Sequence, residues 1–242
     1  MDLSIVLPTL NEAKNISILI PQLEDFFSKK VNNFEIVVVD DKSPDGTADV
    51  AKNLNKKFGN IKVIVKEKRE GLGEALRVAY NECEGDAIFS LDADLAFEFS
   101  DISNLFDEFN KGFDFVAGSR YDAESSYKKH SVYLVVKSVI SFFGNKFSSF
   151  VLGVPLKDFS LNFRIMKTSA WKSINTNKKN NDFLMEVIYC FAQSGYSLSE
   201  VNVTFKPRIY GESKTSVPKQ MFFFIKSLFD LRLGWCKSRL KK

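Results

Sequence analysis

Two carboxylates one residue apart follow a short apolar run in the first half of the chain. Residues 87–91 (Ala-Ile-Phe-Ser-Leu) predict a buried strand, and Asp92 and Asp94 come directly after it. Both carboxylates would therefore leave a rigid element at one edge of a sheet. Carboxylate oxygens are hard ligands that suit Mg²⁺ or Mn²⁺ bridged to a diphosphate, although a turn or helix cap also explains many Asp-x-Asp pairs. Asp92 and Asp94 are thus candidate metal ligands.

A second acidic pair, Asp40 and Asp41, ends another β-branched run at residues 35–39. Carboxylates in that position accept hydrogen bonds from a base or a ribose, as an acidic residue does in dinucleotide-binding folds. The residues at 43–47 (Ser-Pro-Asp-Gly-Thr) are turn-forming types and also predict a turn followed by a helix start. Asp41 is therefore a candidate for a nucleotide pocket.

The elements that must position these residues are short β-branched runs alternating with helical patterns, which predicts βαβ units and a parallel sheet. The expected strands are residues 3–7, 35–39, 61–65, 87–91 and 113–117. Ligands bind outside the carboxyl ends of strands in open α/β sheets. We therefore expect the loops that follow four of these strands to surround one crevice; these loops are residues 8–12, 40–47, 92–94 and 118–121.

Two familiar nucleotide signatures are absent from the sequence. Gly71 and Gly73 match the first two glycines of a dinucleotide fingerprint, but Leu76 occupies the third position, and no P-loop motif occurs. A dehydrogenase and a P-loop enzyme are therefore disfavoured. We expect the two glycines to let a loop fold closely over a nucleotide, with an ordinary helix start as the alternative.

The composition is that of an ordinary globular chain of 242 residues, 45% hydrophobic and 26% charged. One or two domains fit this length. Cys83, Cys190 and Cys236 are isolated, which suits a reduced cytosolic protein and fits neither a disulfide framework nor a zinc ribbon. Because His130 is the one histidine, a multi-histidine metal site is excluded.

Two segments of the second half predict helices with unusual surfaces. Residues 130–150 leave a very wide apolar face beside a narrow polar stripe, and we expect that face to pack in the core, with contact to a lipid chain as the alternative. Residues 218–237 combine a line of basic residues with many aromatic ones. This pattern suits a membrane surface and docking onto the domain equally.

The C-terminal segment is basic, with eight Lys and Arg residues against Asp230 from Lys214 onward. This distribution favours an anionic surface, either lipid headgroups or nucleic acid. The apolar stretches at 132–143 and 221–225 fall short of the roughly 18 residues that a spanning helix needs, and the N-terminus lacks the features of a signal peptide. We therefore expect a peripheral location at the cytoplasmic face of a membrane, without a transmembrane segment.

Seven motifs resemble, in order, those of family 2 glycosyltransferases of the dolichol-phosphate mannose synthase type. They stand at residues 8–12, 39–41, 43–47, 71–73, 92–94, 118–121 and 208–214. The resemblance implies an α/β fold of the GT-A type, Rossmann-like with a mostly parallel central sheet flanked by helices. We place this domain at residues 1–215 and a basic amphipathic C-terminal helix and tail at 216–242. The resemblance also implies a nucleotide-sugar donor such as GDP-mannose or UDP-glucose, Mg²⁺ or Mn²⁺, and inversion at the sugar carbon.

The resemblance further implies roles for individual residues. Pro8, Glu12 and Asp41 would line the nucleotide pocket. Asp92 would lie on the ribose and sugar side, and Asp94 would bind the metal. The phosphates would be met by residues from two further motifs, namely Arg120, Arg208, Ser213 and Lys214.

The chain departs from the family pattern at two positions. Ala96 stands where such synthases usually carry Gln or Ser, and because alanine cannot ligate a metal, water or Glu98 would have to substitute. Asn162 stands where glycine is common. Asn tolerates a left-handed backbone better than most residues, so we expect the turn to be kept.

The expected chemistry depends on the acceptor. Displacement at the anomeric carbon builds charge on the departing diphosphate, which a metal on Asp94 together with Arg208 and Lys214 would neutralise. A polyprenyl phosphate needs little help from a base, because a phosphate monoester with a second pKa near ~6 is largely dianionic at neutral pH.

A sugar hydroxyl acceptor would need a general base, for which Asp158 and Glu186 are the candidates. Either carboxylate could instead be structural, Glu186 by pairing with Arg164, because deeply buried charges are usually paired.

The leading hypothesis is an inverting transfer of mannose or glucose from a nucleoside diphosphate to a polyprenyl phosphate, dolichyl or undecaprenyl, at the cytoplasmic membrane face. A small membrane-anchoring subunit is a further expected partner, and nucleic acid is not. The alternatives are transfer to a glycan hydroxyl in surface polysaccharide synthesis and a nucleotide-binding pseudo-enzyme, the latter motivated by Ala96.

Overall fold

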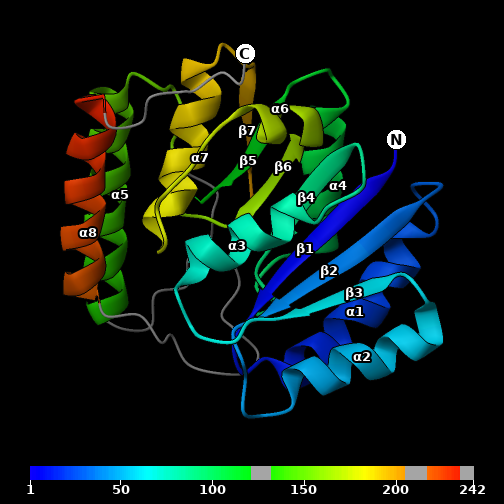
Figure 1. The fold of residues 1–242 in the computed structure, drawn as a ribbon. Helices are drawn as coiled ribbons and strands as arrows, with labels where there is room; N and C mark the ends of the chain where they lie inside the picture. Colours follow the sequence, from blue (N-terminus) through cyan, green and yellow to red (C-terminus); the bar gives the residue numbers. More distant parts are fainter. Residues whose placement is uncertain (121–131, 205–216, 235–242) are drawn as a thin grey trace.

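A computed structural model describes residues 1–120, 132–204 and 217–234, and its central element is a seven-stranded sheet (Figure 1). The strand order is β3-β2-β1-β4-β6-β5-β7. The strands are parallel except for β6, which runs antiparallel to β4 and β5. Their bounds are β1 Leu3–Thr9, β2 Phe34–Asp40, β3 Ile61–Val65, β4 Ala87–Leu91, β5 Phe115–Ser119, β6 Phe163–Lys167 and β7 Leu198–Asn202.

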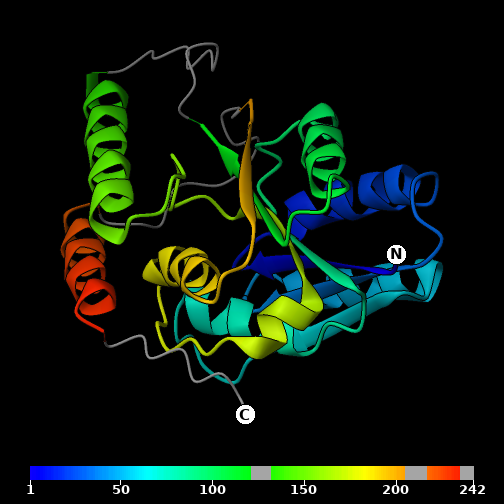
Figure 2. The ribbon, with the colours of Figure 1, turned by 90° about the horizontal axis from the view of Figure 1, so that it is seen from above.

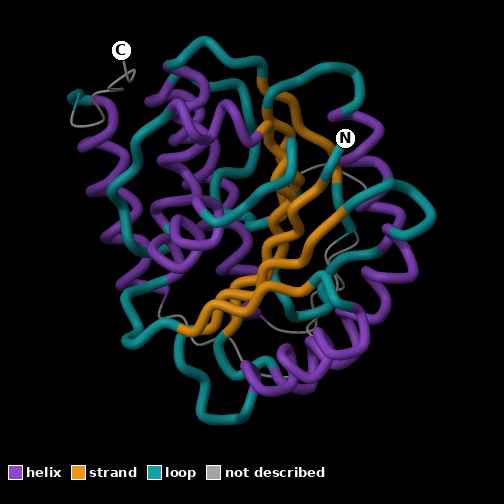
Figure 3. The backbone as a smooth tube through the Cα atoms, turned by 45° about the vertical axis from the view of Figure 1, so that its right-hand side comes forward, coloured by secondary structure: helices purple, strands orange, loops and turns teal. Residues whose placement is uncertain are grey.

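Helices cover both faces of this sheet, which forms one continuous twisted layer between them (Figure 3). Their bounds are α1 Ala13–Phe27, α2 Thr47–Phe58, α3 Leu72–Asn81, α4 Phe99–Phe109, α5 Val132–Leu152, α6 Thr168–Ser173, α7 Asp182–Gln193 and α8 Val217–Arg232. The hydrophobic core is accordingly divided in two: α1, α2 and α4 line one half, and α3, α6 and α7 line the other.

Strand β1 shows how alternation in the sequence builds these two half-cores. Leu3, Ile5 and Leu7 are buried in the half that α1 lines, whereas Val6 is buried in the half that α3 lines. Successive side chains of a strand point to opposite faces, so a run that is apolar at every position is buried on both sides.

The expected mostly parallel α/β sheet flanked by helices is confirmed. Strands β3 and β4 have the predicted bounds, whereas β5 begins and ends two residues later than predicted, in register with β7 from Phe115↔Leu198 to Ser119↔Asn202. Strands β6 and β7 were not predicted. Strand β6 carries the buried Arg164 where a core strand normally carries an apolar residue, and edge strand β7 has no buried residue.

We expected the apolar face of helix α5 to pack in the core. In the part of α5 whose side chains are described, this expectation is wrong. Asn145 and Ser148 are buried, whereas four phenylalanines are 42 to 84% exposed, namely Phe142, Phe143, Phe147 and Phe150. The polar stripe therefore faces the protein, where its groups bond to backbone carbonyls of the same helix.

Helices α5 and α8 lie side by side at one end of the molecule, outside α7 (Figures 1 and 2). Leu228 and Leu231 of α8 are buried, and the Ser227 hydroxyl donates a hydrogen bond to Asp182 at the start of α7. Ile225 and Phe229 are almost half exposed. Helix α8 thus docks onto the domain with one face and leaves apolar side chains on another. None of the helices in the described ranges is both long and apolar enough to cross a membrane.

Candidate active site

Three strained residues mark the loops at the carboxyl ends of β1, β2 and β4, which are adjacent strands in the sheet. Asn11, Lys42 and Leu95 each have a φ of 57 to 59°, and each lies within four residues of the end of one of these strands. A left-handed conformation costs a non-glycine residue roughly 1–3 kcal/mol and is found mainly where surrounding contacts impose it. This edge of the sheet is therefore the first place to look for a site.

The loops after β1 and β2 are joined by hydrogen bonds from backbone to side chain. The N–H groups of Asn11 and Glu12 donate to Ser43 Oγ at 2.8 Å and Thr47 Oγ1 at 3.0 Å. The Ala13 N–H donates to Asp45 Oδ2 at 3.1 Å. Partial burial acts to raise the pKa of Asp45, but hydrogen bonds from Thr47 and Ala13 outweigh it and hold that pKa below its usual value. The two loops therefore form one rigid wall.

Asp40 and Asp41 have different environments although they are neighbours in the chain. Asp40 is turned into its own loop, where it accepts hydrogen bonds from Ser43 N–H at 2.8 Å and Thr9 Oγ1 at 3.0 Å. Asp41 forms an ion pair with Lys66 Nζ at 3.0 Å, and both side chains are less than 10% exposed. Asp41 is thus held in place and has its charge compensated.

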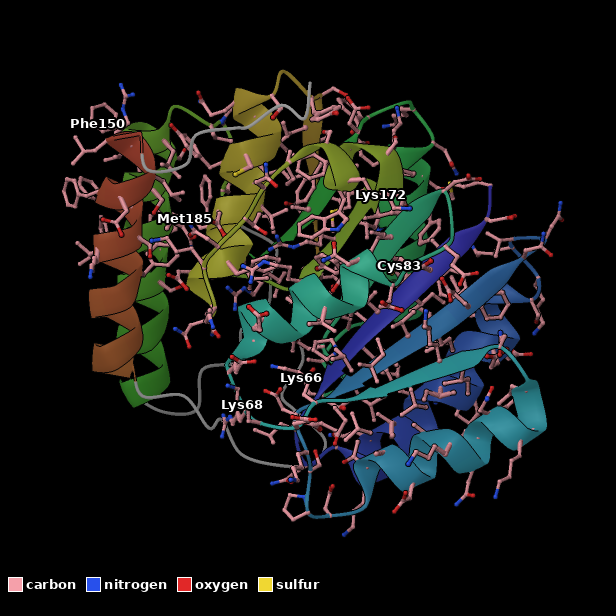
Figure 4. The ribbon with its side chains drawn as sticks, viewed as in Figure 1. Lys66, Lys68, Cys83, Phe150, Lys172 and Met185 are labelled. Atoms are coloured by element: carbon pink, nitrogen blue, oxygen red, sulfur yellow. The ribbon has the colours of Figure 1, made fainter. Side chains whose placement is uncertain are left out.

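Lys66 was missed by the sequence interpretation. It follows β3 directly and lies where the carboxyl ends of β1, β2 and β3 converge (Figure 4). The available signal was a cation placed directly after a predicted strand, at the same edge as the acidic pairs. Of the other residues predicted for this pocket, Pro8 is half-buried in β1, and half-buried Glu12 accepts a hydrogen bond from Asn15.

Asp92 and Asp94 leave β4 as predicted, and each is fixed by a hydrogen bond. Asp92 Oδ1 accepts from the Asn162 amide at 3.0 Å, and Asn162 Oδ1 in turn accepts from Ser90 Oγ at 2.8 Å. Asp94 is 3% exposed, and its Oδ1 accepts the Ala96 N–H at 3.2 Å across the strained Leu95.

Asn162 does not act as the sequence predicted. It is absent from the residues of positive φ in the described chain, so it does not replace glycine in a left-handed turn. Its side chain instead links the loop before β6 to β4, because its amide oxygen accepts from Ser90 within β4 and its amide nitrogen donates to Asp92 just after β4. Asn162 thus orients Asp92, which is a role that the backbone argument could not reveal.

These carboxylates fit a divalent metal that is shared with a substrate. No three His, Cys, Asp or Glu side chains within the described ranges lie close enough to hold an ion by themselves. Mg²⁺ is usually held by one or two carboxylates together with substrate phosphates, and Asp94 and Asp92 supply that donor set. Ala96 is fully buried, and Glu98 forms the capping box of α4 with Asp101.

Arg120 and Asp158, which were predicted for different tasks, form one bidentate ion pair. Arg120 Nε and Nη2 donate to Asp158 at 2.8 and 3.2 Å, and Nη2 also donates to Ser160 Oγ at 2.8 Å. Asp158 additionally accepts the Ser160 N–H and hydroxyl. We refer to Arg120, Asp158 and Ser160 as the arginine clamp. The Asp158 side chain is fully buried, whereas Arg120 keeps 20% exposure.

The second candidate base, Glu186, lies at a different place. It is buried in α7, and its carboxylate accepts the backbone N–H groups of Asn177 and Lys178 at 2.9 to 3.1 Å. Burial raises the pKa of Glu186, and these hydrogen bonds oppose the rise. The alternative in which Glu186 pairs with Arg164 is wrong, because the Arg164 guanidinium donates to the carbonyls of Leu184 and Leu161.

The glycines at 71 and 73 approach the protein's own backbone. Gly71 caps α3 with a φ of 111°, and a side chain at Gly71 or Gly73 would collide with the carbonyls of residues 178–180. The prediction that these glycines fold over a nucleotide is therefore not supported by their surroundings. They let the start of α3 contact the segment before α7.

Several of the predicted site residues lie at the carboxyl edge of the sheet, and others fall outside the residues that the structure describes. Asp41 and Asp94 end strands on either side of β1, and two strand spacings amount to about 10 Å, which one nucleoside diphosphate can span. Arg208, Ser213 and Lys214 lie outside the described residues, as do Tyr121 and His130.

A mostly parallel sheet with acidic residues after β2 and β4, and with the reversed strand β6 beside them, defines an α/β domain of the GT-A type. The chain belongs to glycosyl transferase family 2, whose model matches residues 4–198.

Two named relatives cover most of the chain. It is 31% identical to a dolichol-phosphate mannosyltransferase of Pyrococcus furiosus, over 96% of this chain and 64% of that protein. It is 27% identical to a polyprenol monophosphomannose synthase of Mycolicibacterium smegmatis, over 88% of this chain and 80% of that protein. The chain thus spans slightly less than two thirds of the Pyrococcus protein.

Solved structures of similar fold include two synthases whose names indicate a different acceptor, phosphoglycerate. Mannosyl-3-phosphoglycerate synthase from Rubrobacter xylanophilus matches with a TM-score of 0.71 and 17% identity, over 100% of this chain and 76% of that chain. Glucosyl-3-phosphoglycerate synthase from Mycobacterium tuberculosis, in complex with Mn²⁺ and UDP-glucose, matches with a TM-score of 0.68 and 19% identity, over 96% and 79%. At these identities the likeness concerns the fold.

Proposed function

We propose that this chain transfers a hexose, mannose or glucose, from a nucleoside-diphosphate sugar to a polyprenyl phosphate with inversion. The observation that carries the proposal is the acidic edge where Asp41 and Asp94 end neighbouring parts of the sheet, within the span of one donor molecule. The names of the two relatives support the acceptor class, because both act on polyprenyl or dolichyl phosphates.

The donor side of the proposal assigns a task to each residue of the acidic edge. Asp41, held by Lys66, lines the nucleotide pocket together with Pro8 and Glu12. Asp94 and Asp92 would hold Mg²⁺ or Mn²⁺. When bound, the ion neutralises charge on the departing diphosphate.

The phosphate side is assigned to cations. Arg120, whose side chain keeps 20% exposure, faces the substrate phosphates. Arg208, Ser213 and Lys214 complete this side, as the family motif implies.

The contacts of the two candidate bases favour an acceptor that brings its own charged nucleophile. Asp158 is fully buried and engaged by Arg120 and Ser160, and Glu186 is engaged by two backbone N–H groups. A general base must reach the proton that it abstracts, and both carboxylates are already used as acceptors. A phosphate monoester is largely ionised at neutral pH and needs no such group.

The exposed face of α5 and α8 supports attachment to a membrane, and we place the protein at the cytoplasmic side. Its apolar residues are Phe142, Phe143, Phe147 and Phe150 of α5 together with Ile225, Phe229 and Leu233 of the α8 segment. We call this set the phenylalanine face. Exposed apolar residues in such a group mark a contact with lipid or with another protein, and a small membrane-anchoring subunit would use the same surface. The boundary between residues 215 and 216 stays a proposal.

A two-stage experiment tests the proposed function. GDP- and UDP-sugars are first screened by thermal shift with and without Mn²⁺, and the best donor is then supplied in radiolabelled form with a lipid extract. We expect the label in a chloroform-soluble product that mild acid releases. Label in a water-soluble glycan would favour the hydroxyl acceptor, and metal-independent binding without any transfer would favour the pseudo-enzyme.

A further inference from the structure

Helix α5 carries two opposite faces at the height of Asn145. Asn145 points inward and is 2% exposed, whereas Phe143, Phe147 and Phe150 are exposed by 64, 47 and 84%. At about 100° per residue, these three phenylalanines lie on the opposite side of the helix from Asn145. The same rigid turns therefore meet the protein on one side and the surroundings on the other.

Asn145 is tied to the chain segment that follows the helix. Its side-chain oxygen accepts the Phe159 N–H at 2.8 Å, while its amide nitrogen donates to the Ser141 carbonyl within α5. Phe159 is fully buried, so its backbone cannot move without disturbing the core. A buried hydrogen bond of this kind is costly to leave unmade.

Phe159 lies between the two residues that hold Arg120. Asp158 precedes it and Ser160 follows it, and both contact the guanidinium of Arg120 at 2.8 to 3.2 Å. One hydrogen bond thus connects the arginine clamp to helix α5. The clamp therefore takes its position partly from the helix that carries the phenylalanine face.

We propose that Asn145 is a positioning residue for the transfer reaction: it fixes the arginine clamp to helix α5 and so aligns Arg120 with the phosphate of an acceptor whose lipid chain lies along the phenylalanine face. This inference rests on the proposed function, since it names the step that Asn145 serves. The lipid acceptor approaches along the outer face of α5, and the inner face of the same turns sets the guanidinium that receives its phosphate.

The first arm of the test needs no substrate. The Arg120 Nε–H donates to buried Asp158, so its NMR signal should exchange slowly with solvent in the wild-type chain. In Asn145→Leu we expect that signal to shift and to lose protection. Asn145→Asp keeps an oxygen that accepts the Phe159 N–H, and it should restore the signal. An unchanged signal in a folded Asn145→Leu chain would overturn the proposal.

The second arm is a double-mutant cycle on turnover. We expect Asn145→Leu to lower kcat/KM for the acceptor by about 10- to 100-fold, as small misplacements of catalytic geometry do, with the donor KM unchanged. In an Arg120→Lys background, which removes the bidentate fork, the same substitution should cost far less. An equal cost in both backgrounds means that Asn145 does not act through Arg120 and would refute the inference.

Ser148→Ala is the matched control. Ser148 is also buried on the inner face of α5, but its hydroxyl donates only to the Gly144 carbonyl of its own helix among the contacts described. Its substitution should leave the Arg120 signal and the acceptor kcat/KM unchanged. If the wild-type chain transfers nothing to polyprenyl phosphate, the proposed function fails, while the NMR arm still decides the link between Asn145 and Arg120.

Discussion

The acidic edge of the sheet and the phenylalanine face break the usual rule of burial in opposite ways. At the edge, charged groups such as Asp41, Lys66 and Asp94 are buried. On α5, large aromatic side chains are exposed while asparagine and serine are buried. Charges and exposed apolar surface both cost free energy in water-soluble domains unless a partner compensates them. The comparison shows that the two regions suit different partners: the acidic edge suits a polar ligand, and the phenylalanine face suits an apolar surface.

Removing one member of the buried ion pair should have the largest effect on stability. Lys66→Met leaves the Asp41 carboxylate buried without its cation, which typically costs about 3–5 kcal/mol. Urea unfolding measures this loss. The double variant Asp41→Asn/Lys66→Met should recover much of it, and a single variant as stable as the wild type would show that the edge does not depend on this pair.

Asp94→Asn should affect the reaction more than the fold. The amide keeps an oxygen for the Ala96 N–H but offers a metal much less charge, so we expect turnover to fall roughly 10²- to 10³-fold. Initial rates and nucleotide affinity with and without Mn²⁺ test this. Asp107→Asn on exposed α4 is the control, and metal-dependent binding that survives Asp94→Asn would contradict the assignment.

Replacing phenylalanines of the phenylalanine face by serine should weaken membrane binding and leave donor binding unchanged. Phe147→Ser/Phe150→Ser removes two exposed rings, each worth about 1.5–3 kcal/mol when fully buried, so vesicle partition should fall at least tenfold. Co-sedimentation with anionic vesicles measures it. Ile18→Ser, at a partly exposed residue of α1, should leave vesicle partition unchanged and serves as the control. If the double variant also partitions like the wild type, the phenylalanine face does not bind the membrane.

The smallest effect concerns pH. Burial raises the pKa of Glu186, so the folded state holds its proton more tightly than the unfolded state does. The contribution of Glu186 to stability is therefore most favourable below its ordinary pKa and declines as pH rises through the folded pKa. Relative to Glu186→Gln, the wild-type free energy of unfolding should fall as the pH rises from 4.5 through the folded pKa. A constant difference across that range would contradict this account.

Local sequence patterns were sufficient to predict the strands and the acidic loops in the first half of the chain. The apolar runs at β1, β2 and β4 are buried mostly on both faces, so their sequence reports their structure directly, and the loops after β2 and β4 carry the acidic pairs. The placement of Asp41 and Asp94 at one edge follows from strand order, which the βαβ pattern largely determines.

Long-range pairings could not be predicted in the same way. Lys66, Asn162 and the arginine clamp each depend on contacts between segments distant in sequence, and residue type alone names no partner. The prediction that the apolar face of α5 packs in the core was wrong for a related reason. The periodicity of α5 separates polar from apolar residues but cannot say which side faces the protein, because that depends on distant polar partners such as the Phe159 N–H, which donates to Asn145.

The reversed strand β6 has a consequence for how this protein can evolve. Between positions 158 and 164 a single stretch anchors Arg120, orients Asp92 and inserts a guanidinium beneath α7. Inserting one residue there would turn β6 over, exchange its two faces and misalign donor and acceptor sides together. Natural variants of this stretch should therefore differ in residue type but keep the same length.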